Sequence, residues 1–280
     1  MAGKESRWPY SPSLAVGAIM TGIFAILTIL HTIRLFKTRT WFCIPFIVGG
    51  IFEAIGYGAR AASNSNSNRE SLPLYIMQAL LILLAPILFA ASVYMILGRL
   101  IRATGAESYA IIRVTRITKI FVGGDILCFL VQAMGAGMLS GADSKEGKDR
   151  GQNVILGGLI LQIIIFLLFL LVAMIFHRRL RNRPTGKTLD TSITWERMLS
   201  QLYIVSVLIT IRNLFRVIEY GAGEDGYLLQ NEWPIYVFDA LLMAIVLAVC
   251  SFWYVGKMRS RQDDIDLSSA ESGVRVSRRK

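Results

Sequence analysis

Five side chains that could bind or pair charges lie within one short part of the chain. A run of helix-forming apolar residues contains Arg212, Arg216 and Glu219, and the next apolar run opens with Tyr236 and Asp239. Spacings of three and four residues place side chains on one face of a helix. A charge at the centre of a membrane helix costs roughly 2.5–3.5 kcal/mol on insertion scales, so such charges usually face the protein interior and serve a function. The pattern therefore indicates a polar site inside a helical bundle.

Two readings of this polar pattern stay open. An acidic, glycine-rich loop with Glu232 separates the two runs, and an earlier apolar run carries Glu53 and Arg60, seven residues apart on one helical face. The side chains could form inter-helix ion pairs that brace the bundle, for example Arg60 or Arg216 with Asp239. A subset could instead line an outward-open cavity and contact a polar headgroup. Both functions can coexist.

Glu219 is the first candidate for a headgroup contact. It follows Arg216 by three residues, so the two share a face and the guanidinium can hold the carboxylate ionised. Tyr236 and Asp239 open the next apolar run three residues apart and can face the same cavity mouth. Asp125 and Gln132, also seven residues apart in an apolar run, are further candidates.

Composition defines the elements that must position these residues. The chain has 280 residues, 54% of them hydrophobic, and a mean hydropathy of +0.52. About 20 apolar residues span a bilayer as a helix. We predict an all-α polytopic membrane protein with one seven-helix domain over residues 14–255, an extracellular segment 1–13 and a disordered cytoplasmic tail 256–280. The predicted spans are Leu14–Ile33, Phe42–Ala62, Leu74–Leu97, Ile117–Leu139, Val154–Phe176, Leu199–Ile218 and Ile235–Val255.

The net charge of +11 is distributed in a way that predicts topology. Basic residues follow the first, third, fifth and seventh spans, whereas the alternate loops are balanced or acidic. The positive-inside rule then places the N-terminus outside and the C-terminus in the cytoplasm. The basic excess adds contact with anionic lipids, and its distribution argues against nucleic-acid binding.

Residue types that are missing exclude several functions. A zinc hydrolase needs a cluster of His ligands, but His31 and His177 are the only two histidines. The last predicted span has no lysine for a retinal Schiff base. Without a nucleophile motif or a phosphate-binding loop, we expect no enzyme activity, and any transport is passive or ion-coupled. We expect no cofactor, although His31 leaves haem ligation open as a minor alternative.

A series of short motifs runs in order from the second span to the seventh. Each motif alone is weak, and their common order makes the pattern specific. The motifs are Glu53-x-x-Gly56-Tyr57-x-x-Arg60; Tyr75-x-x-Gln78 with Leu84-Ala85-Pro86 and Ala90-Ala91-x-x-Tyr94; Gly98-Arg99; Asp125 with Gln132-x-x-Gly135-x-Gly137; Gly158 with Gln162; and Phe215-Arg216-x-x-Glu219 leading to Gly226, Glu232, Tyr236 and Asp239.

This pattern resembles the fungal RTA-like proteins, the lipid-translocating exporter family. The resemblance implies seven helices, an outside N-terminus, a plasma-membrane location and export or flipping of an amphiphilic lipid in stress resistance, with a sphingoid long-chain base as one substrate type. A seven-helix lipid sensor and a haem or porphyrin transporter remain alternatives, and oligomeric state stays open. Polar pattern and resemblance together give these candidate substrate-binding residues: Glu219, Asp239, Arg216, Glu232, Tyr236, Asp125, Gln132, Glu53, Arg60 and Gln78.

Overall fold

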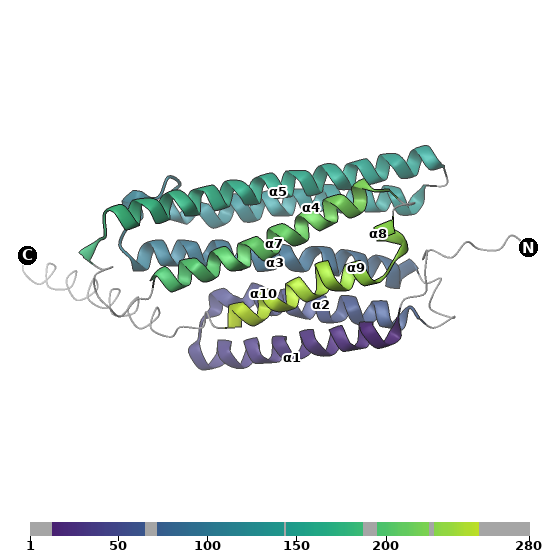
Figure 1. Ribbon diagram of the computed structural model, residues 1–280, viewed down its shortest axis with the longest axis horizontal. Helices are drawn as coiled ribbons and strands as arrows, with labels where there is room; N and C mark the ends of the chain where they lie inside the picture. The colour runs from purple at the N-terminus through teal and green to yellow at the C-terminus, as the bar shows by residue number, and fades with distance from the viewer. Residues whose placement is uncertain (1–12, 65–71, 143, 187–194, 224–226, 252–280) are drawn as a thin grey trace, which may run out of the picture.

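Seven long apolar helices run along one axis in the computed structural model, which describes residues 13–64, 72–142, 144–186, 195–223 and 227–251 (Figure 1). No strand occurs within these ranges, and each of the seven helices is long and apolar enough to cross a membrane, which confirms the predicted all-α, seven-span class. The spans are α1 (Leu14–Thr38), α2 (Ile44–Ala62), α3 (Leu72–Ala103), α4 (Val114–Gly141), α5 (Lys145–Asn182), α7 (Trp195–Gly221) and a composite seventh of α9 (Trp233–Ile235), η3 (Tyr236–Leu241) and α10 (Leu242–Cys250).

Short helical turns connect some of these spans. They are η1 (Trp41–Cys43), η2 (Glu107–Tyr109) and α8 (Tyr227–Gln230). Most of the predicted N-terminal segment, the whole predicted tail and the last four residues of the predicted seventh span lie outside the described residues.

The helices extend beyond their predicted apolar cores, most clearly in α5. This helix begins at Lys145, where the Ser144 side chain accepts a hydrogen bond from the Gly147 N–H at 3.2 Å and caps the first turn. Its 38 residues correspond to about 57 Å at 1.5 Å per residue. A hydrocarbon core of about 30 Å is much shorter, so both ends of α5 extend past the apolar layer. Hydropathy alone marks only the part inside it.

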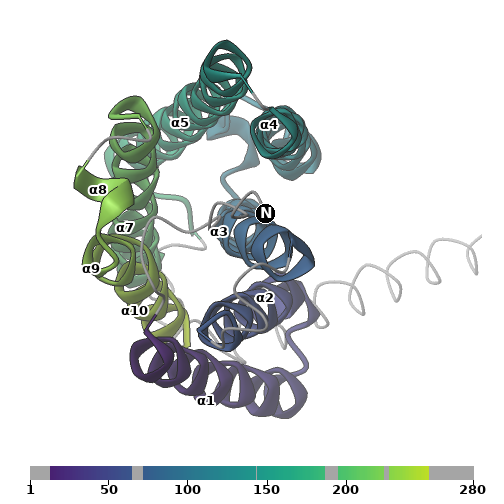
Figure 2. The same cartoon turned by 90° about the vertical axis from the view of Figure 1, so that its right-hand side faces the viewer.

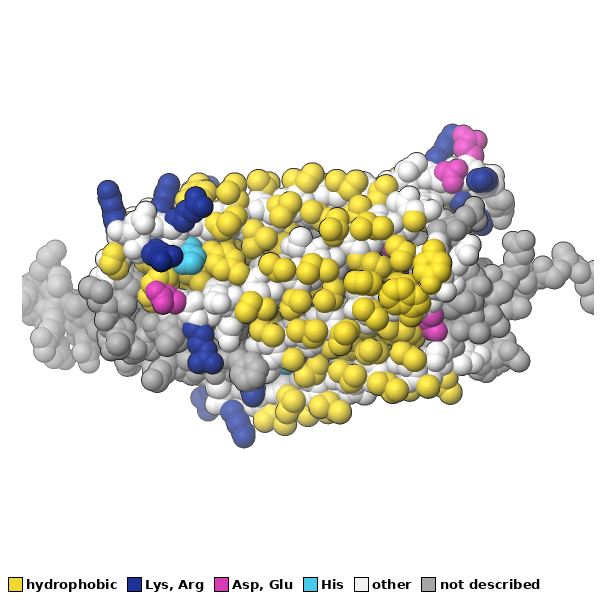
Figure 3. Space-filling view, viewed as in Figure 1, with side chains coloured by type: hydrophobic (Ala, Val, Ile, Leu, Met, Phe, Trp, Pro, Cys, Tyr) yellow, Lys and Arg dark blue, Asp and Glu magenta, His cyan; other side chains and the backbone are white. Residues whose placement is uncertain are grey.

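The seven spans form a ring in chain order (Figure 2). Each span contacts the next, and α10 closes the ring on α1. Helix α3 also contacts α7 across the ring and is the most buried span. Hydrophobic side chains cover the middle of the outer surface in a broad band, with charged side chains toward the ends (Figure 3). The apolar outside faces lipid, and the polar residues lie within.

Close packing of α4 on α5 depends on glycine. A Cβ added to Gly135 would lie 2.8 Å from the backbone nitrogen of Ile155 and 2.9 Å from the carbonyl oxygen of Gly151, so the two backbones touch there. The Gly137–Gly141 spacing is a small-xxx-small step, a pattern typical of helix contacts. A Cβ at Gly137 or Gly141 meets nothing within 4 Å, so in this structure neither residue makes such a contact.

The seventh span is irregular in its first half. Residues Tyr236–Leu241 form one π-helical segment, within which Tyr236, Asp239 and Ala240 are buried. A π-segment widens the helix locally and is frequent at functional sites. The Asp239 carboxylate of this segment faces two arginines of α7.

Candidate functional site

Asp239 is the centre of a buried ionic cluster. Its Oδ1 accepts a hydrogen bond from Arg212 Nε at 2.6 Å, and its Oδ2 accepts one from Arg216 Nη2 at 2.7 Å. Arg216 Nη1 also donates to Glu219 Oε2 at 2.9 Å. Arg212 and Asp239 are fully buried, and Arg216 and Glu219 are 7% exposed. The predicted shared face on α7 is present, and so is the predicted bracing pair of Arg216 with Asp239.

The proline in α3 provides a further partner for Arg212. Pro86 has no N–H, so the carbonyl of Ile82, four residues earlier, loses its helical donor. Arg212 Nη2 donates to this same Ile82 oxygen at 3.2 Å. The proline therefore leaves a backbone carbonyl free to accept inside the ring, and Arg212 of α7 donates a hydrogen bond to it.

Glu53 of α2 belongs to the same cluster but lacks a partner. Its side chain is fully buried and lies within electrostatic range of Asp239, Arg212 and Arg216. Neither carboxyl oxygen has a hydrogen-bond donor among the described residues. The hydroxyl of Tyr57, one turn later on α2, is also buried without a partner there. The cluster thus has unused acceptor capacity on its α2 side.

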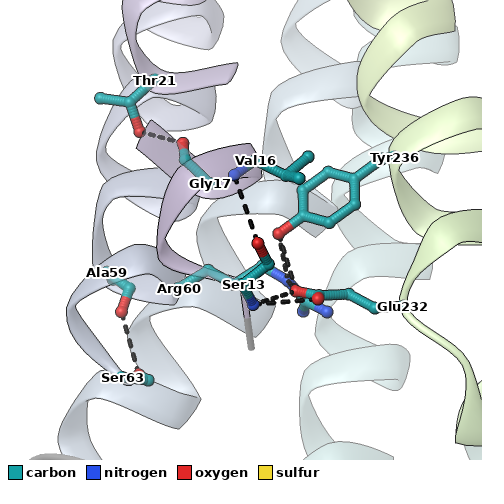
Figure 4. Close-up of polar contacts among 9 residues, drawn as sticks. All are labelled: Ser13, Val16, Gly17, Thr21, Ala59, Arg60, Ser63, Glu232 and Tyr236. Carbon is teal, nitrogen blue, oxygen red and sulfur yellow. Dashed lines mark hydrogen bonds and ion pairs between the residues drawn. The ribbon is translucent and has the colours of Figure 1, made fainter. Parts of the chain in front are cut away.

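A second cluster surrounds Glu232, just before α9 (Figure 4). Arg60 Nε and the Tyr236 hydroxyl donate to Glu232 Oε1 at 3.3 and 2.8 Å. The backbone N–H of Ser13, the N-cap of α1, donates to both Glu232 oxygens at 3.0 and 2.9 Å. Glu232 therefore joins the ends of α1, α2 and the seventh span. The bracing hypothesis named Asp239 as a possible partner of Arg60. Arg60 instead pairs with Glu232.

Asp125 and Gln132 form hydrogen-bonded pairs outside both clusters. Asp125 Oδ2 accepts a hydrogen bond from the Tyr94 hydroxyl at 2.8 Å, and Gln132 Nε2 donates to Gln162 Oε1 at 2.9 Å. Gln78 is buried, and its Oε1 has no partner among the described residues. Apart from Gln78, the structure thus divides the predicted site into separate polar groups along the ring.

Several residues of these polar groups are not among the candidate substrate-binding residues predicted from the sequence. Tyr94 and Gln162 are buried polar residues within apolar spans, which was the available signal for both. Arg212 was recognised in the polar pattern but was not among the candidate substrate-binding residues. The role of Ser13 had no such signal, because its backbone N–H makes the contact.

His31, the residue considered for haem ligation, packs between α1 and α10. It is fully buried in α1, and its Nε2 donates to the Leu247 carbonyl of α10 at 2.8 Å. The ring lies 5.8 Å from that of Phe46. The three cysteines are buried, and none of them is in a disulfide bond within the described residues: Cys43, Cys128 and Cys250.

The family model and the similar proteins all indicate the same family. The family described as RTA1 like protein matches residues 46–262. Protoporphyrin uptake protein 1 of Saccharomyces cerevisiae is 38% identical over 74% of this chain and 67% of its own length. Probable lipid transporter atnI of Emericella nidulans is 30% identical, over 89% and 67%. Sphingoid long-chain base transporter RSB1 of Saccharomyces cerevisiae is 26% identical, over 88% and 72%. No solved structure matches the chain.

Proposed function

Because the chain belongs to the RTA1-like family of fungal membrane proteins, we propose that it moves an amphiphilic lipid with a cationic headgroup across the membrane. Two relatives are named as a lipid transporter and a sphingoid long-chain base transporter. A sphingoid base carries one ammonium group on a long apolar tail, and related cationic amphiphiles share this chemistry.

The charge balance of the inner cluster is the observation that carries this proposal. Two guanidinium groups, of Arg212 and Arg216, face three carboxyl groups, of Asp239, Glu219 and Glu53. With every carboxyl group ionised, the cluster has one negative charge in excess, and the carboxyl without a hydrogen-bond partner among the described residues is that of Glu53. A buried carboxylate is very costly unless a cation pairs with it. A single ammonium headgroup supplies one charge and three donors.

The other acidic residues have supporting positions in this proposal. Glu219 and Asp239 already accept hydrogen bonds from arginine, so they hold the guanidinium groups beside the headgroup site. Glu232, Arg60 and Tyr236 form the second cluster, which lies at the start of the seventh span. The headgroup passes these groups while its tail remains between the helices. Asp125, Gln132 and Gln78 continue the polar lining elsewhere in the ring.

A tetrapyrrole is the second candidate substrate, favoured by the relative named protoporphyrin uptake protein 1. Its propionate groups would need the guanidinium groups of Arg212 and Arg216, which are already paired with carboxylates. The charge balance therefore favours the cationic amphiphile. A Soret band that co-purifies with the protein would reverse this ranking.

Reconstitution into liposomes tests the proposed function. We expect protein-dependent movement of a fluorescent sphingoid base between leaflets, because its ammonium group matches the charge deficit. The N-acylated analogue has the same chain without the cation and is the matched control; it should move much less. Equal rates with and without protein would instead favour a lipid sensor that alters lipid distribution indirectly.

We infer further that the N-terminus is outside and the C-terminus cytoplasmic, at the plasma membrane. The basic residues in the last turns of α1, α3 and α5 and just after them support this orientation through the positive-inside rule. A cysteine placed between Arg181 and Lys187 should resist a membrane-impermeant reagent in intact cells and react after permeabilisation. Labelling in intact cells would reverse the orientation.

A further inference from the structure

Two adjoining cavities lie between the end of α5 and the start of α7. One encloses about 470 Å³ and the other about 340 Å³, and they share His177, Arg181 and Tyr203 in their walls. Ligand sites in proteins typically enclose about 300–1,000 Å³. We call this continuous space the α5–α7 cleft. It lies at the basic end of the bundle, where Lys and Arg side chains gather at the margin of the hydrophobic band (Figure 3).

One end of the α5–α7 cleft is polar and carries excess positive charge. Arg178 and Arg181 are exposed side chains of α5, and Glu196 is the one acidic residue in the cleft walls. On the floor, the rings of His177 and Tyr203 stack at 5.7 Å, and His177 Nδ1 lies 3.2 Å from the Tyr203 hydroxyl. The floor is therefore braced, whereas the arginines remain directed to solvent. Such a group of donors suits an anion.

The other end of the α5–α7 cleft is apolar and opens on the lipid-facing surface. Met174 lies one turn before Arg178 on α5 and is 45% exposed, and Ile204 of α7 is 49% exposed. Further exposed apolar residues continue along both helices toward the middle of the band: Leu167, Leu168, Leu171, Val207 and Ile211. Because the polar end meets the apolar band directly, an occupant must combine an anionic group with a hydrocarbon tail.

We propose that the α5–α7 cleft binds an anionic phospholipid from the surrounding leaflet. Its phosphate lies against Arg178 and Arg181, and one acyl chain follows Met174 and Ile204 along the helix surface. This lipid is a different ligand from the proposed substrate. The cleft is also separate from the ionic cluster, since it uses the first turns of α7 whereas the cluster uses the last.

A lipid titration of the purified full-length protein tests this proposal. The melting temperature in detergent is followed while phosphatidylglycerol or phosphatidylcholine with the same acyl chains is added. The site variant is Arg178→Gln/Arg181→Gln, and the matched control is Arg113→Gln/Arg116→Gln, which removes the same charge from α4 and its N-cap outside the cleft. Both variants change exposed side chains and should fold. A nearby basic residue contributes about 1 kcal/mol to anionic-lipid binding, so the site variant should bind phosphatidylglycerol at least tenfold more weakly.

The proposal expects stabilisation by phosphatidylglycerol in the wild type and the control, and a loss of it in the site variant. An equal loss in the control would show a general charge effect and overturn the proposal. Stabilisation by glycerol phosphate equal to that by the lipid would also overturn it, because the site would then bind free phosphate. So would the absence of any preference for the anionic lipid.

Discussion

Glu53→Gln should abolish transport of a cationic amphiphile while the protein stays folded. The substitution keeps the shape of the side chain but removes the one carboxyl group that has no partner in the inner cluster. Removing one member of a close buried charge pair costs about 2–5 kcal/mol of binding, which corresponds to about thirtyfold or more in headgroup affinity. The measurement is the rate of sphingoid-base movement in proteoliposomes.

Stability separates a headgroup role of Glu53 from a bracing role. No described group bonds to its carboxyl oxygens, so Glu53→Gln should leave the melting temperature unchanged or raise it. Glu146→Gln is the control, because Glu146 is 78% exposed and its one ion pair among the described residues is with neighbouring Arg150 on the surface of α5. It should leave transport unchanged. A Glu53→Gln protein with full transport would refute the headgroup assignment.

Asp239→Asn should be the most destabilising conservative substitution in the bundle. It removes the negative charge that two buried arginines share. Loss of one partner from a buried ion pair costs about 3–5 kcal/mol, because it leaves an uncompensated charge. We expect low yield, a lowered melting temperature in detergent and aggregation on gel filtration.

Two further variants test whether uncompensated charge is the cause. Glu219→Gln should be milder than Asp239→Asn, because Arg216 retains its bond to Asp239. The double variant Arg212→Gln/Asp239→Asn removes one charge of each sign and should recover part of the lost stability. If the double variant is less stable than Asp239→Asn alone, shape complementarity and not charge dominates at this site.

The local periodicity of each span could be read from the sequence. The shared face of Arg212, Arg216 and Glu219 depends only on the geometry of one helix, and the structure contains it. The number of spans likewise follows from apolar length, which is a property of each segment alone. The pair of Arg216 with Asp239 was available as one of two named pairings.

The sequence could not show which side chains on different helices pair with each other. This pairing depends on how each helix is rotated and how deep it lies, and neither is encoded in the periodicity of one span. Arg60 therefore has Glu232 as its partner, a residue that the sequence placed in a loop. Asp125 has Tyr94 as its hydrogen-bond partner. Tyrosine is typical of the membrane interface, so the sequence does not mark Tyr94 as a buried donor. The π-segment of the seventh span shifts the faces of its residues, and apolar spacing does not reveal it.

The position of Asp239 in the chain has a consequence for biogenesis. Arg212 enters the membrane with the sixth span, but its carboxylate partner is made one span later. Until the seventh span inserts, the nascent protein therefore holds a guanidinium within the bilayer without that counter-ion. Glu232, which ties the start of α1 to the same last span, is also synthesised late. Ring closure and the bond between Arg212 and its carboxylate partner thus form in one final step, so chains that terminate early lack both.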